Sequence, residues 1–221
     1  MHNCLDNLIE IQKEIQLKII DTNNVTQKPK IIAVTKTNPI ENILPLINYG
    51  HLDYGENKVQ EALEKWEGIK GDFDHLNLHM IGKLQTNKVK QAVSLFDYIH
   101  SLDNLKLAEK ISNEQVKQNK KMKLFIQINI GEEPQKSGVY ISDIKKFYKS
   151  CVEGLGLNII GVMCLPPNNN NSSSYFSKMK NLKNYLNLKE LSMGMSNDYL
   201  DAIKFEATYI RIGSKIFGKR N

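Results

Sequence analysis

The chain has 221 residues, of which 41% are hydrophobic and 24% are charged, so it can bury the core of one large domain. No apolar run approaches the roughly 20 residues of a membrane-spanning helix, and the acids in MHNCLDNLIEIQKEI are unlike a signal peptide. The formal net charge of +6 invites a nucleic-acid partner, but the lysines are scattered among acids, which is typical of a solvated surface. Cys4, Cys151 and Cys164 have no paired spacing, so we expect neither disulfides nor zinc, and a cytoplasmic location.

The predicted elements begin with an amphipathic helix at residues 3–20, where apolar residues recur at three- and four-residue steps. Apolar runs then predict strands at 30–35, 51–56, 76–82, 97–102, 123–130, 157–165, 189–195 and 208–213. Helical segments are expected after them at 37–50, 56–66, 84–96, 103–119, 142–155, 174–188, 196–207 and 214–220. This alternation predicts an α/β fold, a closed (β/α)₈ TIM barrel that forms a single domain over residues 1–221, with an extra N-terminal helix. An open doubly wound sheet is the alternative.

Some local details accompany this assignment. Asp103 and Ser142 are expected to cap the helices that follow them, and Pro45 is expected to bend the helix that contains it. The low-complexity stretch PPNNNNSSS, residues 166–174, follows the sixth strand and is interpreted as a polar loop; a functional lid is the alternative.

Lys36 is the first candidate functional residue, because it ends the apolar run KIIAVTK between two threonines. Side chains alternate along a strand, so Val34 and Lys36 share one face. An inward lysine at the mouth of a barrel is partly desolvated, which lowers its pKa and favours Schiff-base chemistry with an aldehyde. A surface lysine whose stem packs on the barrel is the alternative.

A phosphate site is predicted from the ends of the last two strands, which read SMGMSND and RIGSKIFG. Unpaired N–H groups at a helix start suit a phosphate, Ser196 and Ser214 add hydroxyl donors, and Gly213 permits close approach of the backbone. Simple capping of the two helices by serine is the alternative explanation.

Arg211 lies between two isoleucines on the last strand and needs an acceptor if it points inward. A ligand ring nitrogen or carboxylate would serve, as would a salt bridge to Glu56. A lysine, an arginine and a phosphate cradle at one barrel mouth favour pyridoxal 5′-phosphate (PLP), with its aldehyde at Lys36 and its pyridine nitrogen at Arg211. A sugar-phosphate aldolase, which uses a Schiff-base lysine without a cofactor, remains open at this point.

Motifs along nearly the whole chain sharpen this hypothesis: IIAVTKT, DYGENKVQEALEK, HMIGKLQTNKV, IHSLDNLKLAEKI, QINIGEEPQKSGV, GVMCLPP, LSMGMSNDYLDAI and RIGSKIFGKR. In this order they resemble the YggS/PROSC family of PLP homeostasis proteins, whose barrel is related to the N-terminal domain of alanine racemases. The resemblance implies a Schiff base on Lys36 and further cofactor contacts from Ser196, Arg211, Gly213 and Ser214. It also implies that Asn57 and the segment 79–85 line the pocket. The sequence departs from the family at Leu78, where an aromatic residue is usual.

The resemblance leaves the choice between enzyme and carrier to chemistry. Racemisation needs two acid–base groups on opposite faces of Cα. In alanine racemase the second is a tyrosine from another domain, for which we expect no room in this chain. Tyr54 is the nearest substitute by motif, and we expect it to be a packed barrel tyrosine. A pyridine nitrogen that faces Arg211 also stays unprotonated, which makes the ring a poor electron sink.

We therefore expect a cytoplasmic, monomeric PLP carrier without robust turnover that supplies PLP-dependent apo-enzymes and has no nucleic-acid or membrane partner. A weak PLP-dependent amino-acid racemase is the first alternative. A nucleic-acid-binding protein is the second, and it would show salt-dependent binding to RNA or DNA.

Overall fold

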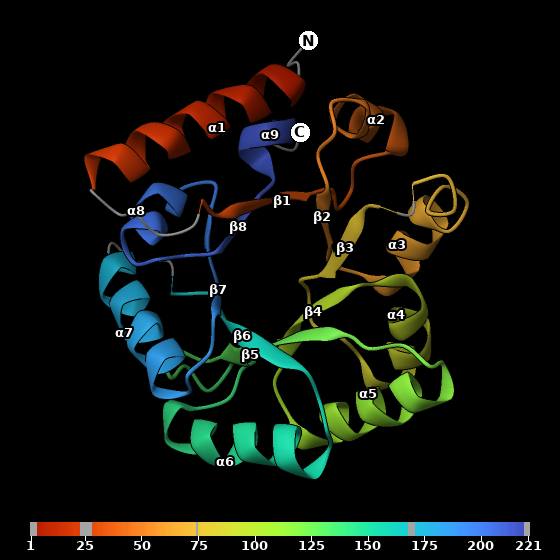
Figure 1. Cartoon of the computed structure of the whole chain (residues 1–221), viewed down its shortest axis with the longest axis vertical. Helices are drawn as coiled ribbons and strands as arrows, with labels where there is room; N and C mark the ends of the chain where they lie inside the picture. Colours follow the sequence, from red (N-terminus) through yellow and green to blue (C-terminus); the bar gives the residue numbers. More distant parts are fainter. Residues whose placement is uncertain (1–3, 23–27, 74, 168–170, 219–221) are drawn as a thin grey trace.

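The computed structural model describes residues 4–22, 28–73, 75–167 and 171–218. Within these residues, parallel strands close into a barrel in the order β1 to β8, surrounded by helices (Figure 1). The strands are β1 Lys30–Val34, β2 Asp53–Glu56, β3 Asn77–Met80, β4 Tyr98–Leu102, β5 Lys123–Ile128, β6 Ile159–Cys164, β7 Glu190–Met195 and β8 Tyr209–Ile212. β1 pairs with β8, so the sheet has no edge and the open doubly wound alternative is wrong.

Helical segments connect the strands, as the sequence predicts. They are α2 Ile40–Asn48, α3 Val59–Trp66, η1 Thr86–Lys88, α4 Val89–Leu95, α5 Leu105–Lys117, η2 Ile141–Asp143, α6 Ile144–Lys149, the π-helical turn η3 Ser150–Gly154, α7 Ser172–Tyr185, α8 Tyr199–Lys204 and α9 Ser214–Phe217. Pro45 lies inside α2, and the expected bend there stays a prediction. None of the helices in the described parts of the chain is both long and apolar enough to cross a membrane.

Two expected helix caps are wrong. The side chain of Asn104, not Asp103, accepts a hydrogen bond of 2.9 Å from the Leu107 amide at the start of α5. Ser142 lies within the 3₁₀ turn η2, and α6 begins after Asp143. Either residue of an Asp-Asn pair can cap, and the pair alone does not say where the backbone becomes helical.

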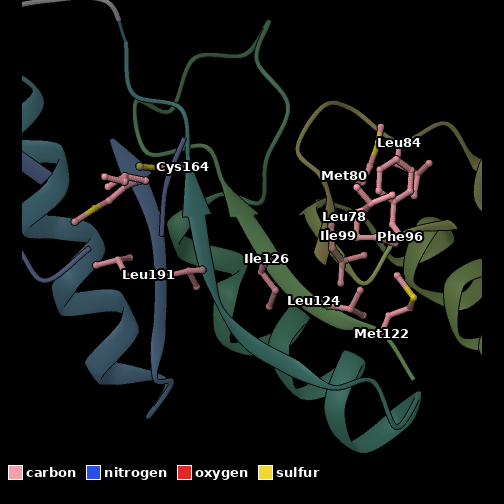
Figure 2. Close-up of a cluster of buried hydrophobic side chains, with 14 of the residues drawn as sticks. Leu78, Met80, Leu84, Phe96, Ile99, Met122, Leu124, Ile126, Cys164 and Leu191 are labelled. Carbon is pink, nitrogen blue, oxygen red and sulfur yellow. The ribbon is translucent and has the colours of Figure 1, made fainter. Parts of the chain in front are cut away.

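Side chains alternate between the barrel interior and the surrounding helices. Outward-facing residues form one large core cluster between the sheet and the helices, part of which Figure 2 shows. A smaller cluster fills the interior and contains Ile32, Tyr98, Phe125, Met163 and Tyr209. This two-layer packing fixes which residue of each strand end points into the barrel mouth.

The N-terminal helix α1, Cys4–Asp21, lies outside the ring beside α2, α8 and α9 (Figure 1). Leu8, Ile11 and Ile15 of its predicted apolar stripe are fully buried. Glu14 accepts hydrogen bonds from Tyr199 and from Lys215, the latter at 2.6 Å. α1 therefore stabilises α8 and α9, which follow the last two strands.

Candidate functional site

The predicted site residues gather at the carboxyl ends of four neighbouring strands. In the sheet, β8 lies between β7 and β1, and β2 lies on the other side of β1. Lys36 follows β1, Asn57 follows β2 and Ser196 follows β7, while Gly213 and Ser214 follow β8. Residues that are up to 178 positions apart in the chain therefore meet at one mouth, where TIM-barrel active sites lie.

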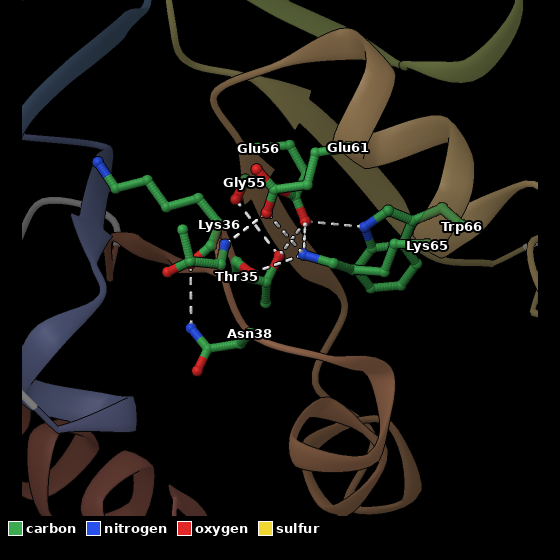
Figure 3. Close-up of polar contacts among 9 residues, drawn as sticks. Thr35, Lys36, Asn38, Gly55, Glu56, Glu61, Lys65 and Trp66 are labelled. Atoms are coloured by element: carbon green, nitrogen blue, oxygen red, sulfur yellow. Dashed lines mark hydrogen bonds and ion pairs between the residues drawn. The ribbon is translucent and has the colours of Figure 1, made fainter. Parts of the chain in front are cut away.

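Hydrogen bonds from neighbouring residues hold the backbone around Lys36 in place. Thr35 is fully buried, and its hydroxyl donates to Glu56 Oε1 at 2.7 Å. The Asn38 amide donates to the Lys36 carbonyl at 3.2 Å. Thr37 adopts φ +64°, a left-handed conformation that β-branched residues seldom occupy, and its N–H donates to the Glu61 carboxylate. The two threonines that flank the lysine therefore hold its backbone, and Figure 3 shows the Lys36 side chain extending away from these contacts.

Glu56 is the centre of this support (Figure 3). Its Oε1 accepts hydrogen bonds from Thr35, from Lys65 Nζ at 2.8 Å and from Trp66 Nε1 at 3.0 Å. Lys65 also donates to the Thr35 carbonyl at 2.7 Å. Glu56 points outward to α3, so it is not the partner of Arg211 that the sequence left as an alternative.

The two loops that are predicted to bind phosphate, after β7 and after β8, are hydrogen-bonded to each other. The Ser196 hydroxyl accepts a hydrogen bond of 3.4 Å from the Lys215 amide in the first turn of α9. The N-cap positions are Asp198 for α8 and Gly213 for α9, and neither serine caps its helix. The alternative of simple serine capping is therefore wrong for Ser196 and Ser214.

Gly213 lies where the chain has little space. A Cβ atom at this position would sit 3.3 Å from Cβ of Val34, tighter than most real contacts. A side chain here would need Val34, on the strand that leads to Lys36, to shift by a few tenths of an ångström.

Arg211 lies inside the barrel and is only 4% exposed. Its Nη1 donates to Ser192 Oγ at 2.7 Å, and its Nη2 donates to the Cys164 carbonyl at 2.8 Å. Burial lowers the pKa of Arg211, but a guanidinium starts so high that it stays charged. Its two hydrogen-bond acceptors are neutral, and a guanidinium has five N–H donors, so it can also donate to a ligand above it.

The structure also shows a buried polar cluster that sequence reasoning missed. Asp53, His79, His100 and Ser192 come from four strands and hydrogen-bond to one another beneath the mouth. His79 was expected to line the pocket, yet it is fully buried in the barrel interior. Polar residues within the predicted strands were the available signal, but only closure of the barrel brings these four together.

Two other candidates are placed clearly. Asn57 lies at the mouth after β2, and its backbone packs so closely on Gly82 that a Cβ there would be 2.3 Å from the Asn57 carbonyl oxygen. Tyr54 is fully buried on the outer face of β2, beside Trp66, and its hydroxyl donates to the His51 carbonyl at 3.0 Å. Tyr54 is therefore a packed tyrosine, as expected.

The donors at the mouth fit PLP. A primary amine, two hydroxyls, a helix start and a buried guanidinium match an aldehyde, a phosphate and a pyridine nitrogen. No group of three or more His, Cys, Asp or Glu side chains in the described residues could hold a metal ion. The expected loop at 166–174 is shorter than predicted, because residues 172–174 belong to α7. Residues 168–170 lie outside the described residues, so a role as a lid stays a prediction.

Comparison with known proteins agrees with this chemistry. The family model described as alanine racemase, N-terminal domain, matches residues 14–221. A pyridoxal phosphate homeostasis protein of Aquifex aeolicus is 37% identical and covers 99% of both chains. The protein of that name in Escherichia coli K12 is 29% identical over 100% of this chain and 98% of its own.

Solved structures of other proteins also resemble this chain. PipY of Synechococcus elongatus PCC7942, a structure with PLP bound, matches at a TM-score of 0.81 and 30% identity, over 92% of this chain and all of that one. Alanine racemase from Corynebacterium glutamicum matches at a TM-score of 0.68 and 14% identity, over 95% of this chain and 62% of that one. The latter shows a shared fold.

Proposed function

This chain belongs to the YggS/PROSC family of pyridoxal phosphate homeostasis proteins, and we propose that it binds PLP at the carboxyl end of its barrel as a Schiff base on Lys36. In this proposal the protein holds the cofactor without robust catalytic turnover. It thereby takes part in PLP, or vitamin B6, homeostasis and passes PLP to PLP-dependent apo-enzymes. We expect it to act as a cytoplasmic monomer.

One observation carries the proposal: Lys36 lies at the end of β1, where hydrogen bonds hold the backbone, next to β8, which contains Arg211 and is followed by Gly213 and Ser214. PLP supplies an aldehyde that condenses with a primary amine, with loss of water. Lys36 would provide that amine. Ser196, Gly213 and Ser214 would bind the phosphate, and Asn57 would line the opposite side.

Two features support a carrier rather than an enzyme. Arg211 can only donate hydrogen bonds, so a pyridine nitrogen that faces it accepts and stays unprotonated. An unprotonated ring withdraws electrons poorly, which disfavours chemistry at the α-carbon of an amino acid. Tyr54 is packed on the outer face of the sheet and cannot serve as a second acid–base group at the mouth.

The decisive experiment compares wild type, Lys36→Ala and Lys149→Ala after loading with PLP and removal of the excess. Lys149 is an exposed lysine on α6, outside the predicted site, and serves as the control. We expect a visible absorption band that borohydride converts to a stable PLP–peptide adduct in wild type and in Lys149→Ala. Lys36→Ala should form no adduct at this site. A band of equal strength in Lys36→Ala, or none in wild type, would overturn the proposal.

Turnover and transfer are tested with the loaded protein. We expect no racemisation of L- or D-amino acids by the loaded protein and recovery of activity by a PLP-depleted apo-enzyme mixed with it. Sustained racemisation that Lys36→Ala abolishes would instead establish a weak racemase. Failure to reactivate any apo-enzyme would argue against the supply function.

A further inference from the structure

Four hydrogen bonds form a continuous chain through the barrel interior. Arg211 Nη1 lies 2.7 Å from Ser192 Oγ, which lies 2.9 Å from His100 Nδ1. His100 Nε2 lies 3.0 Å from His79 Nδ1, and His79 Nε2 lies 2.9 Å from Asp53 Oδ1. Asp53 is the first residue of β2, so the chain ends toward the amino end of the barrel, away from the mouth.

The Asp53 carboxylate can only accept, so His79 carries a proton on Nε2 and donates it to Asp53. With both rings neutral, each remaining hydrogen bond has one direction: His100 Nε2 donates to His79 Nδ1, and the Ser192 hydroxyl donates to His100 Nδ1. Arginine can only donate, so the Ser192 oxygen accepts from Arg211. In this arrangement both histidines share one tautomer.

Burial and neighbouring charges agree with these states. His79, His100 and Ser192 are fully buried. Burial lowers the pKa of both histidines, most strongly for His100, where a protonated His79 and the charge of Arg211 would both act in the same direction. Burial is the largest influence on the pKa of Asp53 and would raise it, but the hydrogen bond from His79 and the charges of His79, Lys30 and His51 together outweigh burial, so the net shift is downward.

Further ionisable groups lie at both ends of the chain. Lys30 and His51 act on Asp53, while Asp97 and Lys30 act on His79. The effects on His79 partly cancel, because the carboxylate of Asp97 opposes the ammonium of Lys30. At the other end, Arg211 acts on His100, and Cys164 and Asp198 act on Arg211.

Ring stacking holds the two imidazoles in this alignment. The His79 ring stacks on Tyr98 with centroids 4.2 Å apart, and the His100 ring stacks on Phe125 with centroids 4.1 Å apart. Both aromatic partners belong to the close-packed interior cluster. Neither imidazole can turn over without displacing a packed neighbour.

We propose that Asp53, His79, His100 and Ser192 form a one-directional hydrogen-bond relay that orients Arg211 and links its positive charge to a carboxylate near the opposite end of the barrel. The four residues are positioning residues that act through Arg211. The value of this orientation for ligand binding rests on the proposed function, because Arg211 would meet the pyridine nitrogen of PLP. The relay itself does not depend on PLP.

The first test uses the full-length, PLP-free protein with ¹⁵N-labelled histidine. Ring resonances are assigned by their loss in His79→Gln and His100→Gln and are followed in wild type at pH 7. We expect both rings to be neutral, with the proton on Nε2 and none on Nδ1. A proton on Nδ1 of either ring, or a doubly protonated ring, would refute the relay whether or not PLP binds.

The second test separates orientation of Arg211 from general packing. Ser192→Ala removes the link next to Arg211, and Ser101→Ala is the matched control. Ser101 is also a buried strand serine, and its hydroxyl has no hydrogen-bond partner among the described residues. We expect Ser192→Ala to weaken PLP binding about tenfold, the scale of one charge-assisted hydrogen bond, and to shift the visible band of the bound cofactor.

Ser101→Ala should change PLP binding less than about twofold, since no hydrogen bond is lost. Equal effects of the two substitutions, or an unchanged visible band in Ser192→Ala, would refute the positioning role of the relay. If wild type formed no borohydride-stable adduct with PLP, the proposed function would fail while the histidine tautomers would still decide the relay.

Discussion

Lys65→Met tests whether the support beneath Lys36 is a buried ion pair. The Lys65 side chain is 8% exposed, Glu56 is not exposed at all, and their charged atoms are 2.8 Å apart. At an effective dielectric constant of about 20, two charges at this distance attract by about 6 kcal/mol, and desolvation of both offsets part of that. Methionine preserves the length of the side chain but leaves the Glu56 charge with only Thr35 and Trp66 as donors. We expect the free energy of unfolding to fall by about 3–5 kcal/mol.

The assay is equilibrium unfolding in urea, monitored by the fluorescence of the single tryptophan, Trp66, and by circular dichroism. Lys149→Met is the matched control, because Lys149 forms an i,i+4 pair with Glu153 in which both side chains are more than 60% exposed. It should change stability by less than about 0.5 kcal/mol. Adding Glu56→Gln to Lys65→Met should restore much of the loss, since the glutamine oxygen still accepts hydrogen bonds but carries no charge.

A loss below about 1 kcal/mol for Lys65→Met would refute this reasoning, because a pair that weak behaves as a surface salt bridge. A double variant as unstable as Lys65→Met would show that lost packing, not an unpaired charge, causes the effect. Because Lys65 also bonds to the Thr35 carbonyl, the single variant should form its PLP adduct less completely than wild type.

Three further predictions follow from the described geometry. Asn104→Ala should lower the free energy of unfolding, measured in urea, by about 1 kcal/mol, whereas Asp103→Ala should leave it almost unchanged. A larger loss for Asp103→Ala than for Asn104→Ala would contradict the assignment of Asn104 as the N-cap. Gly82→Ala should lower both the free energy of unfolding and the affinity for PLP, because the added methyl group would displace the backbone of Asn57. Urea unfolding and fluorescence titration measure the two effects. Wild-type values would show that the loop containing Gly82 can move to accept the methyl group. Burial lowers the pKa of His100 in the folded protein, so as the pH falls His100 is protonated in the unfolded state before it is protonated in the folded state. The free energy of unfolding should therefore decline as the pH falls below about 6.5. Equal free energies of unfolding at pH 7.5 and pH 5.5 would contradict that sign.

Local sequence patterns were enough to predict the barrel. Most strands are short apolar runs, each strand is followed by a helical segment, and parallel strands joined by helical crossovers leave few possible topologies. The same logic places Lys36, Ser196, Gly213 and Ser214 at one face, because they follow strands that end at the carboxyl mouth. Their roles toward PLP remain proposals.

The partners of these residues were decided by tertiary structure. Glu56 could pair with Arg211 or with a lysine on the helix that follows it, and the alternation of side chains along β2 turns it outward to Lys65. Asn104 caps α5 in place of its neighbour because the backbone becomes helical one residue later than expected.

By itself the sequence determined the order of strands and helices and the end of the barrel at which its reactive lysine stands, since both depend on periodicity along the chain. Only the tertiary structure decided that Asp53, His79, His100 and Ser192 lie in one line beneath Arg211. They come from four different strands, each of which also contains another polar residue, and their contacts span up to 92 positions of sequence. Which interior residues face each other depends on how the strands are shifted relative to one another when the barrel closes. No local sequence pattern predicts that shift.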